Sequence, residues 1–499
     1  MEPKYLAHNA TNFVNGELAD TKYLALWDDG SCVLKNINTK GASSIYMFYR
    51  AFMDGTTMTI KKNNAKGEIL AQFKVDKTDG NGIRKIPFKT INEPIDLYFE
   101  ANNDRIAKQV STSHISWFAF LSDIPGTTEA GYDQINRSFI ELLNTQTQEL
   151  PIMVENRSDM ARVTQIFERG NWLMLADTVQ SGTPKILNAY DDAWPKNRLG
   201  LSKWLVSKEN PLTARTLVNR VWHQVFGRGI VASLEDMGTQ SDPPSHPALL
   251  DWLSLRFMNE QNWSMKALIK EIVMSGTYRQ SSIVTPELYQ KDPNNELYAR
   301  GPRIRLTAEE IRDQALAVSG LLSKKMYGPG VMPPQPDGVW QSVYSNESWV
   351  ESKGKDKYRR AIYTYLKRTS PYPSFITFDA GSREVCTIRR TVTNTPLQAL
   401  VTLNDPVYLE AAYSFAKSMD MDNVEKGISS GFKKATFSEI DPEELAILKS
   451  LYDQAMVEFS AGTYEENFIG LKEKPSSKLA ALTIVANAIM NLDEFLTKA

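Results

Sequence analysis

The spacing of hydrophobic residues differs between the first quarter of the chain and the rest. In the first quarter, apolar residues alternate with polar ones over short runs separated by Gly, Asn and Asp. Alternation with a period of two is typical of strands that bury one face. The runs are SIYMFYRAF at 44–52, TMTIKK at 57–62, EILAQFKV at 68–75, PIDLYFEAN at 94–102 and HISWFAFL at 114–121. Residues 1–122 are therefore predicted to form a small antiparallel β-sandwich.

Beyond this part the hydrophobic period becomes helical. Pro and Gly in DIPGTTEAGYDQ at 123–134 indicate a boundary, and we expect a linker over residues 123–160. Helix start signals follow, among them Thr307 and Glu310, which have the spacing of a capping box. Residues 161–499 are predicted to form a mainly α-helical domain. The predicted fold class of the whole chain is multidomain α+β, with an N-terminal sandwich of the jelly-roll kind.

Composition and charge exclude several classes of partner. Among 499 residues, 42% are apolar and 23% are charged, which is enough to bury substantial cores. A net charge of −2 argues against a general field for nucleic acid. The basic run at 355–372 comes with no nucleic-acid motif, so we expect no nucleic-acid partner. We also expect no membrane span and no signal peptide on this chain, because no long apolar stretch occurs.

The cysteines and histidines of the chain offer few ligands for a metal ion or a haem group. Cys32 and Cys386 fall in different predicted domains and form no disulfide framework. Neither belongs to a Cys-x-x-Cys-His segment, so the chain has no haem-attachment motif. With four histidines in total, a zinc cage is not expected either. We expect no metal and no cofactor on this chain, and we expect Cys386 to be a buried apolar thiol.

The region after residue 150 resembles a known family. Its motifs run in order from RGNW at 169–172 to the terminal NLDEFLTKA, and they are densest between Asn210 and Ser282. That segment contains NPLTAR, NRVW, FGRG, PPSHP, LLDWL and TYRQSS. The region resembles the planctomycete-type domain of unknown function 1553, which occurs in large exported proteins. The resemblance implies a periplasmic or cell-surface location.

The same resemblance points to a possible partner. Family members usually carry an upstream domain with a Cys-x-x-Cys-His segment, and often a c-type cytochrome domain before it. Neither is present in this chain. The resemblance therefore implies either that the chain is the back half of a longer polypeptide or that a separately encoded, cytochrome-containing front half is its partner.

The order of the predicted strands resembles that of carbohydrate-binding modules of family 6. The resemblance rests on YLALWDDGSCVL at 23–34 and on the strands that follow it. It implies that an exposed aromatic residue stacks on a sugar ring while amide groups bind the hydroxyls. The alternative is that Trp27 belongs to the core. The candidate carbohydrate-binding residues are Tyr23, Trp27, Asn102 and Asn103.

One candidate for chemistry in the helical region is His246. It lies in PPSHP, whose prolines fix an extended backbone ahead of the next helix. A histidine at such a helix start can act as a general base or as one metal ligand. The alternative is that it only caps the helix.

A denser group of charged residues lies in the segment FDAGSREVCTIRRTVTNTP at 378–396. Asp379 and Glu384 would suit acid/base hydrolysis of a glycoside if their carboxyl groups lay ~5–10 Å apart. Arg383 and Arg390 would suit an anionic glycan. Asp313, on a preceding helix, is a further candidate for the same cleft, and the alternative for it is i, i+4 pairing on its own helix. The alternative is an internal network of salt bridges that joins helices.

These observations predict an envelope-associated, glycan-binding protein involved in polysaccharide degradation. An enzymatic, carboxylate-based hydrolysis of the glycan is left open. One alternative is an accessory of a c-type cytochrome electron-transfer system. Another is a non-catalytic surface-assembly protein.

Overall fold

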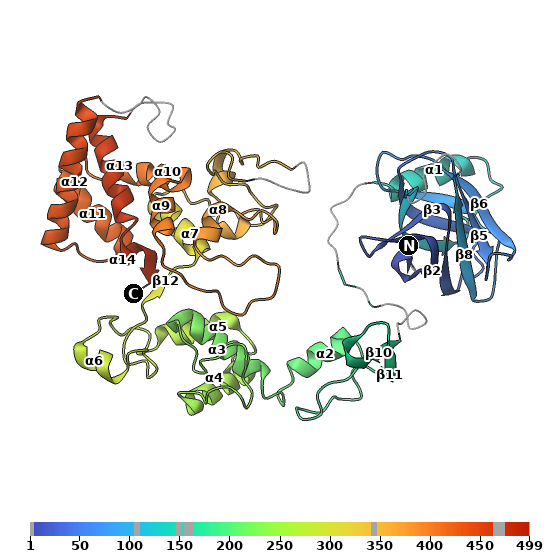
Figure 1. Ribbon diagram of the computed structural model, residues 1–499, viewed down its shortest axis with the longest axis horizontal. Coiled ribbons are helices and arrows are strands. Elements are labelled where there is room, and N and C mark those ends of the chain that lie inside the picture. The colour runs from blue at the N-terminus through green and yellow to red at the C-terminus, as the bar shows by residue number, and fades with distance from the viewer. Residues whose placement is uncertain are drawn as a thin grey trace. The chain divides into compact units, whose positions relative to one another are not determined.

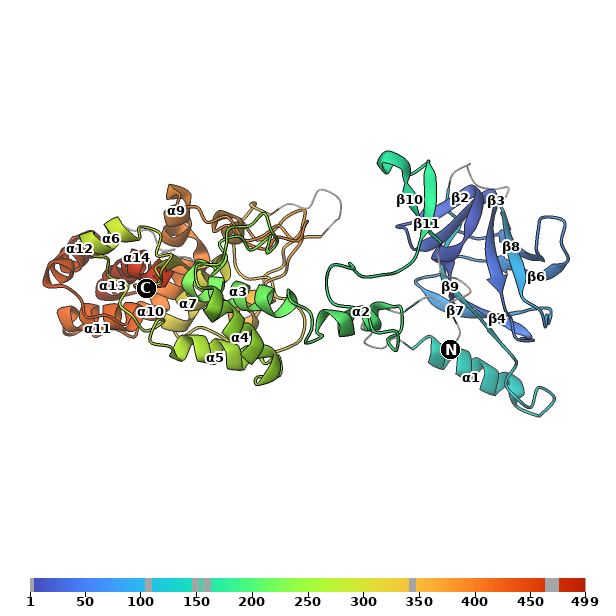
Figure 2. The ribbon, with the colours of Figure 1, turned by 90° about the horizontal axis from the view of Figure 1, so that it is seen from below.

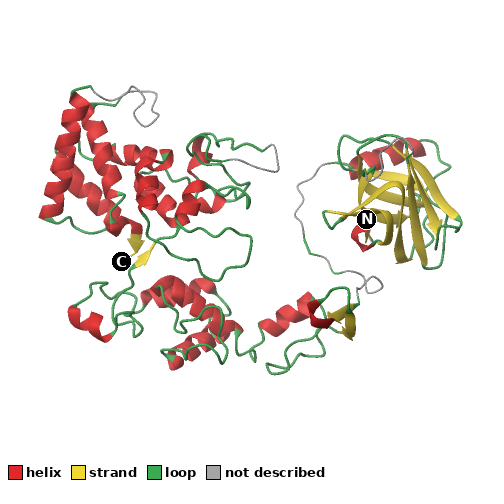
Figure 3. Ribbon diagram, in the orientation of Figure 1, coloured by secondary structure: helices red, strands yellow, loops and turns green. Residues whose placement is uncertain are grey.

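The computed structural model divides the chain into two compact units, Met1–Gly182 and Thr183–Ala499. It describes residues 4–103, 110–145, 152–153, 155, 163–340, 347–462 and 475–498. Strands dominate the first unit and helices the second (Figures 1 and 3). Of the predicted linker, residues 146–151, 154 and 156–160 lie outside the described residues.

The first unit is a nearly closed antiparallel β-sandwich, as predicted. Its strands are β1 (Lys4–Leu6), β2 (Thr11–Ala19), β3 (Tyr23–Ile37), β4 (Ser44–Ala51), β5 (Thr56–Lys62), β6 (Ile69–Val75), β7 (Gly82–Pro87), β8 (Ile95–Asn102) and β9 (Ser113–Leu121). They are hydrogen-bonded in the order β6-β5-β8-β3-β9-β4-β7, with β1 on β9 and β2 on β3. Every pairing is antiparallel.

Strand β3 belongs to both layers of the sandwich. Its residues 24–26 pair with β9, whereas its residues 30–37 pair with β8. The strand changes partner at Asp29 and Gly30, where Asp29 has a φ of 51°. A Cβ atom on Gly30 would lie 2.6 Å from the Asn15 carbonyl oxygen, closer than real Cβ atoms come. Glycine is therefore required where β3 crosses between layers, three positions after Trp27.

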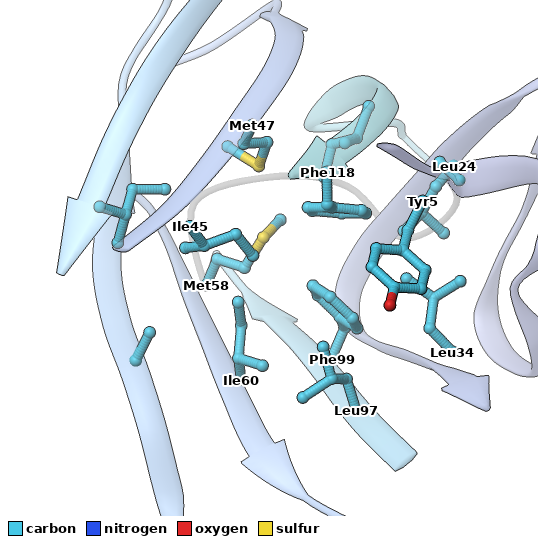
Figure 4. Close-up of a cluster of buried hydrophobic side chains, with 14 of the residues drawn as sticks. Tyr5, Leu24, Leu34, Ile45, Met47, Met58, Ile60, Leu97, Phe99 and Phe118 are labelled. Carbon is cyan, nitrogen blue, oxygen red and sulfur yellow. The ribbon is translucent and has the colours of Figure 1, made fainter. Parts of the chain in front are cut away.

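Alternating residues of the strands fill the interior of the sandwich. On β8, Leu97 and Phe99 are fully buried, whereas the alternating residues Asp96 and Tyr98 are only half-buried. Phe99 and the β9 residue Phe118 lie with ring centres 4.9 Å apart in the middle of this core (Figure 4). Each side chain of this size contributes roughly 1.5–3 kcal/mol when fully buried.

A helix and a two-stranded sheet also belong to the first unit. Helix α1 (Tyr132–Leu143) lies within the predicted linker, and its Phe139 contacts Tyr46 of β4 edge-on, with ring centres 6.5 Å apart. Strands β10 (Thr164–Phe167) and β11 (Leu175–Val179) form a separate two-stranded sheet.

The second unit is mainly α-helical, as predicted. Its helices are α2 (Arg198–Leu205), α3 (Thr213–Phe226), α4 (Pro247–Asn259), α5 (Met265–Met274), α6 (Pro286–Lys291), α7 (Ala308–Val318), α8 (Pro373–Thr377), α9 (Pro396–Asn404), α10 (Pro406–Ala416), α11 (Val424–Thr436), α12 (Pro442–Ser460), α13 (Ser477–Ile489) and α14 (Asp493–Leu496). The predicted capping box is confirmed at α7, where the Thr307 backbone N–H donates to Glu310 Oε2 over 2.9 Å.

The helices form two separate hydrophobic cores. Helices α3, α4 and α5 surround one core, which contains Trp222 and Phe257. Helices α7, α10 and α13 meet in the other, where alanines such as Ala412 and Ala486 allow close packing. The short strands β12 (Ile304–Arg305) and β13 (Thr497–Lys498) pair the segment between the cores with the C-terminal segment. Within the described residues, no helix is long and apolar enough to cross a membrane.

Candidate functional site

One outer surface of the sandwich carries aromatic rings where a half-buried sheet would usually carry polar side chains. It is formed by β3, β9 and β4. On β9 the core residues Ile115 and Phe118 are three positions apart, one more than simple alternation allows. A register shift against β4 between Phe48 and Tyr49 accommodates the extra residue. We call this surface the aromatic face; it comprises Tyr23, Phe48, Phe52, His114 and Trp117.

The rings of the aromatic face contact one another in two groups. Tyr23 and His114 are stacked, with ring centres 5.5 Å apart and planes 7° apart. Phe52 meets the same imidazole edge-on at 4.7 Å. Phe48 and Trp117 form the second group, stacked at 5.5 Å. Phe52 is exposed and the other four rings are half-buried, so both groups reach solvent.

Charged side chains of both signs border the first group. Lys22 Nζ lies 4.9 Å from the centre of the Tyr23 ring, and the Arg50 guanidinium lies 5.6 Å from the centre of the Phe52 ring. Both distances are within the range of cation–π attraction. Burial lowers the pKa of His114, and the carboxylates of Asp20 and Glu17 partly offset this effect. The imidazole is therefore neutral at pH 7 and offers one donor and one acceptor.

The four carbohydrate-binding residues predicted from the sequence have different surroundings. Tyr23 belongs to the aromatic face. Trp27 is half-buried where β3 changes layers, and Asn102 is exposed at the end of β8. Asn103 is buried, and its side-chain amide donates to Thr56 Oγ1 over 3.0 Å. Asn103 thus holds a loop in place instead of facing solvent.

Sequence reasoning missed four of the five rings of the aromatic face. Phe48, Phe52, His114 and Trp117 occur in runs that were recognised as strands. Phe48 stands at a position of β4 where alternation places a solvent-facing side chain, because Met47 and Tyr49 beside it are buried. An aromatic residue at a strand position expected to face solvent was the sequence feature that could have indicated this face.

In the helical unit, the predicted catalytic carboxylates mostly bind neighbouring protein groups. Asp379 accepts hydrogen bonds from the backbone N–H and the hydroxyl of Thr393, at 2.8 and 2.9 Å. Asp313 accepts the Ala361 backbone N–H over 2.6 Å. Glu384 is exposed on the loop between α8 and α9. The carboxylate of Asp379 is therefore occupied by hydrogen bonds from Thr393, whereas that of Glu384 is open to solvent.

The arginines of that loop connect it to both helical cores. Arg390 donates two hydrogen bonds to the carboxylate of Glu309 on α7, at 2.6 and 2.9 Å. Its neighbour Arg389 pairs at 2.9 Å with Glu235, in the segment between α3 and α4. Arg383 is exposed. These contacts favour the interpretation of this segment as an internal salt-bridge network.

Two further residues of the helical unit were singled out from the sequence. His246 is the residue before α4, and its Nδ1 lies 3.0 Å from Ser245 Oγ. Its ring centre is 5.5 Å from that of the buried Tyr298. Cys386 was expected to be buried, and this expectation was wrong: the thiol is exposed, in a loop whose residues 382–389 are all exposed. In the described part of the chain, no three His, Cys, Asp or Glu side chains are placed to hold a metal ion.

Comparison with known families gives a decisive match for the helical unit. The sequence profile of PSD1, described as "Protein of unknown function (DUF1553)", matches residues 197–452. The chain belongs to the PSD1 family. All six residues that were predicted as catalytic lie within the matched region. No curated protein matches the chain.

The solved structures of carbohydrate-binding modules that are similar to the chain match about a quarter of it, a portion about as long as the sandwich. One is a family 6 carbohydrate-binding module from Clostridium stercorarium in complex with cellobiose, 16% identical, covering 24% of this chain and 93% of that chain, with a TM-score of 0.20. Another is a β-1,3-glucan-binding module of that family from Bacillus halodurans, 16% identical, covering 24% and 96%, with a TM-score of 0.21.

A third similar structure is a glycoside hydrolase family 43 arabinoxylan arabinofuranohydrolase from Bacillus subtilis, in complex with cellotetraose. It is 10% identical with a TM-score of 0.19, and the alignment covers 20% of this PSD1 protein and 21% of that chain. The PSD1 protein thus spans about a fifth of the length of that enzyme. At these TM-scores the likenesses assign no ligand to the PSD1 protein.

Proposed function

We propose that the first unit binds a glycan on the aromatic face. The observation that carries this proposal is the group formed by Tyr23, His114 and Phe52 at the protein surface. Aromatic rings offer flat apolar surfaces that match the C–H faces of a pyranose ring. A protein that does not use such a surface usually covers it, because each exposed ring leaves apolar area in water.

The charged residues around the aromatic face supply hydrogen-bonding groups for the hydroxyls of a sugar. Sugar hydroxyls both donate and accept hydrogen bonds. Lys22 and Arg50 donate, whereas the carboxylates of Glu17 and Asp20 accept. The neutral His114 does both, so the face offers hydroxyl groups partners of either kind. Because two cations and two carboxylates balance, this arrangement favours a glycan whose hydroxyls carry the recognition.

We propose that Trp27 and Asn102 extend this site along β3 and β8, and that Asn103 contributes by holding the loop that contains Asp54 and Thr56. The backbone N–H of Asn103 also donates to Asp28 Oδ1 over 2.7 Å, next to Trp27. Asn103 therefore links the position of Trp27 to the loop after β4. Replacing Asn103 is expected to act on the shape of the site instead of removing a direct contact.

For the whole protein we propose a glycan-binding role at the cell envelope, in a periplasmic or cell-surface location. Participation in polysaccharide degradation rests on the hypothesis that Glu384 is catalytic, since its carboxylate is exposed on the loop before α9. A separately encoded, cytochrome-containing partner stays a hypothesis of the same kind. Co-purification of the full chain from its native envelope would test both the location and that partner.

The experiment for the proposed function is a scan of the full chain against an array of polysaccharides, with products analysed by mass spectrometry. We expect retention on at least one glycan, and weaker retention of a Phe52→Ala variant. Val14→Ala is the matched control, because Val14 is an exposed apolar residue of the same unit outside the aromatic face. No retention on any glycan would overturn the proposal.

A further inference from the structure

Helix α9 has its polar side chains inside and its apolar side chains outside. Gln398 and Thr402 are 1% and 2% exposed, whereas Leu397, Leu400 and Leu403 are 63%, 56% and 44% exposed. A helix on the surface of a globular protein normally shows the reverse arrangement. In Figure 2, α9 lies at the margin of the helical unit.

Buried hydrogen bonds hold α9 in this orientation. The Gln398 side-chain amide donates to the carbonyl oxygens of Thr377 and Thr393, at 3.0 and 3.3 Å. The Thr402 hydroxyl donates a hydrogen bond to the side chain of Asn491. The backbone carbonyl oxygen of Thr402 accepts a hydrogen bond from the side chain of Asn487 over 3.4 Å. Rotating the helix to bury its leucines would break these bonds and leave buried polar groups without partners. The outward leucines are therefore specified by the fold.

The exposed leucines of α9 form one stripe along the helix. Leu397, Leu400 and Leu403 follow one another at intervals of three residues, so they lie on neighbouring turns of the same side of the helix. We call these three leucines the α9 surface. Clustered exposed apolar side chains of this kind mark interaction sites.

We propose that the α9 surface binds the same surface of a second copy of this chain. Residues 396–404 contain no charged residue, so a charged partner gains no ion pair there. A second copy of α9 brings an equally uncharged, apolar helix face. The leucines are also symmetric about Leu400, with one three positions before it and one three positions after.

That symmetry matches the geometry of a two-fold dimer. Two antiparallel α9 helices related by a two-fold axis at Leu400 place Leu400 against Leu400 and Leu397 against Leu403 of the other copy. The antiparallel arrangement also brings opposite ends of the two helix dipoles together. Three side chains cover less than the roughly 800 Å² per partner of a standard interface. We therefore expect a weak dimer, with a Kd on the order of micromolar.

Sedimentation analysis of the full chain over about 1–100 µM tests the proposal around the expected Kd. The wild type should shift from monomer to dimer, and Leu400→Glu should stay monomeric with an unchanged melting temperature. Ile447→Glu is the matched control, because Ile447 is an exposed apolar residue on α12. A wild type that is monomeric throughout, or a Leu400→Glu variant that still dimerises, would overturn the proposal.

A cross-linking experiment decides the matter if Leu400→Glu fails to fold. In a Cys386→Ser background, Leu400→Cys should form an intermolecular disulfide under mild oxidation, because the two-fold axis passes near position 400. Val457→Cys, at another exposed apolar position on α12, should not. Equal cross-linking at both positions, or none at position 400, would contradict the proposed two-fold. Neither result depends on whether the first unit binds a glycan.

Discussion

Tyr23 and His114 stack in near-parallel fashion at the protein surface, with 5.5 Å between ring centres, although they are 91 positions apart in the sequence. Strands β3 and β9 bring them together, since Leu24 and Ile115, the next residues along, are paired in the sheet. The imidazole is kept neutral by burial, which lowers the His114 pKa. A flat, uncharged pair of rings therefore faces solvent beside Phe52, and this is the arrangement that a sugar ring can cover.

Trp27→Ala is expected to weaken glycan retention by about tenfold, the effect of losing roughly 1.4 kcal/mol of binding free energy. Trp27 is half-buried, so we expect the melting temperature to fall by only a few degrees. Affinity electrophoresis and thermal melting of the same samples measure the two effects. An unfolded variant would show that Trp27 is a core residue.

Gly30→Ala is expected to destabilise the sandwich by about 2 kcal/mol or more, because the new Cβ would press on the backbone of β2 and β3. The matched control is Gly80→Ala, since no atom lies within 4 Å of a Cβ added at Gly80. Denaturant unfolding followed by tryptophan fluorescence compares the two variants. Equal stability of both would contradict the requirement for glycine where β3 changes layers.

Asp405 makes the stability of the helical unit depend on pH. Burial raises the pKa of its carboxyl group to about 6, against a weaker lowering by its hydrogen bond to Val407 and by Arg312. In the unfolded chain the carboxyl titrates near ~3.9. Between about pH 4 and 6 the folded state therefore binds more protons, so this group's contribution to stability falls as the pH rises.

The corresponding variant is Asp405→Asn, which keeps an oxygen to accept the Val407 backbone N–H at the start of α10. It should flatten the pH dependence between about pH 4 and 6 and raise stability at pH 7 by on the order of 2 kcal/mol. Denaturant unfolding across that pH range provides the measurement. Asp441→Asn, at the exposed start of α12, is the control. A less stable Asp405→Asn at pH 7 would mean that the ionised carboxylate is favourable.

Glu384→Gln tests the catalytic hypothesis for the helical unit. If the chain cleaves a glycan, this variant should lose the activity while its melting temperature stays within a few degrees, because Glu384 is exposed. Arg390→Gln is the structural comparison, since it breaks the paired hydrogen bonds to Glu309 and should lower stability. Full activity in Glu384→Gln would remove Glu384 from any mechanism.

The spacing of hydrophobic residues predicted the fold well in segments where a single period, of two or of 3.6 residues, continues along the whole element. The runs at 44–52 and 94–102 correspond to β4 and β8, and Thr307 begins α7 as its capping box indicates. The aromatic face was not predicted, because it depends on the register between β4 and β9. A single extra residue in β9 turns both His114 and Trp117 outward, and no local sequence rule specifies such a shift.

In the helical unit, residue type predicted neither partners nor exposure. Asp379 and Arg390 have the chemistry of a catalytic group, but their partners, Thr393 and Glu309, can be identified only from the folded chain. Cys386 was predicted to be buried because free cysteines usually are, whereas Cys386 and its neighbours Val385 and Ile388 are all exposed. Burial of a loop depends on which helices lie over it, and that is decided by packing between distant segments.

The most direct test of glycan binding by the aromatic face is isothermal titration calorimetry of the full chain with an oligosaccharide of the glycan retained on the array. The wild type is expected to bind, and Tyr23→Ala and Phe52→Ala are each expected to weaken binding by tenfold or more, about 1.4 kcal/mol. Val14→Ala should bind as the wild type does. Unchanged affinity in Tyr23→Ala and Phe52→Ala, with both variants folded, would contradict the assignment of the glycan to this face.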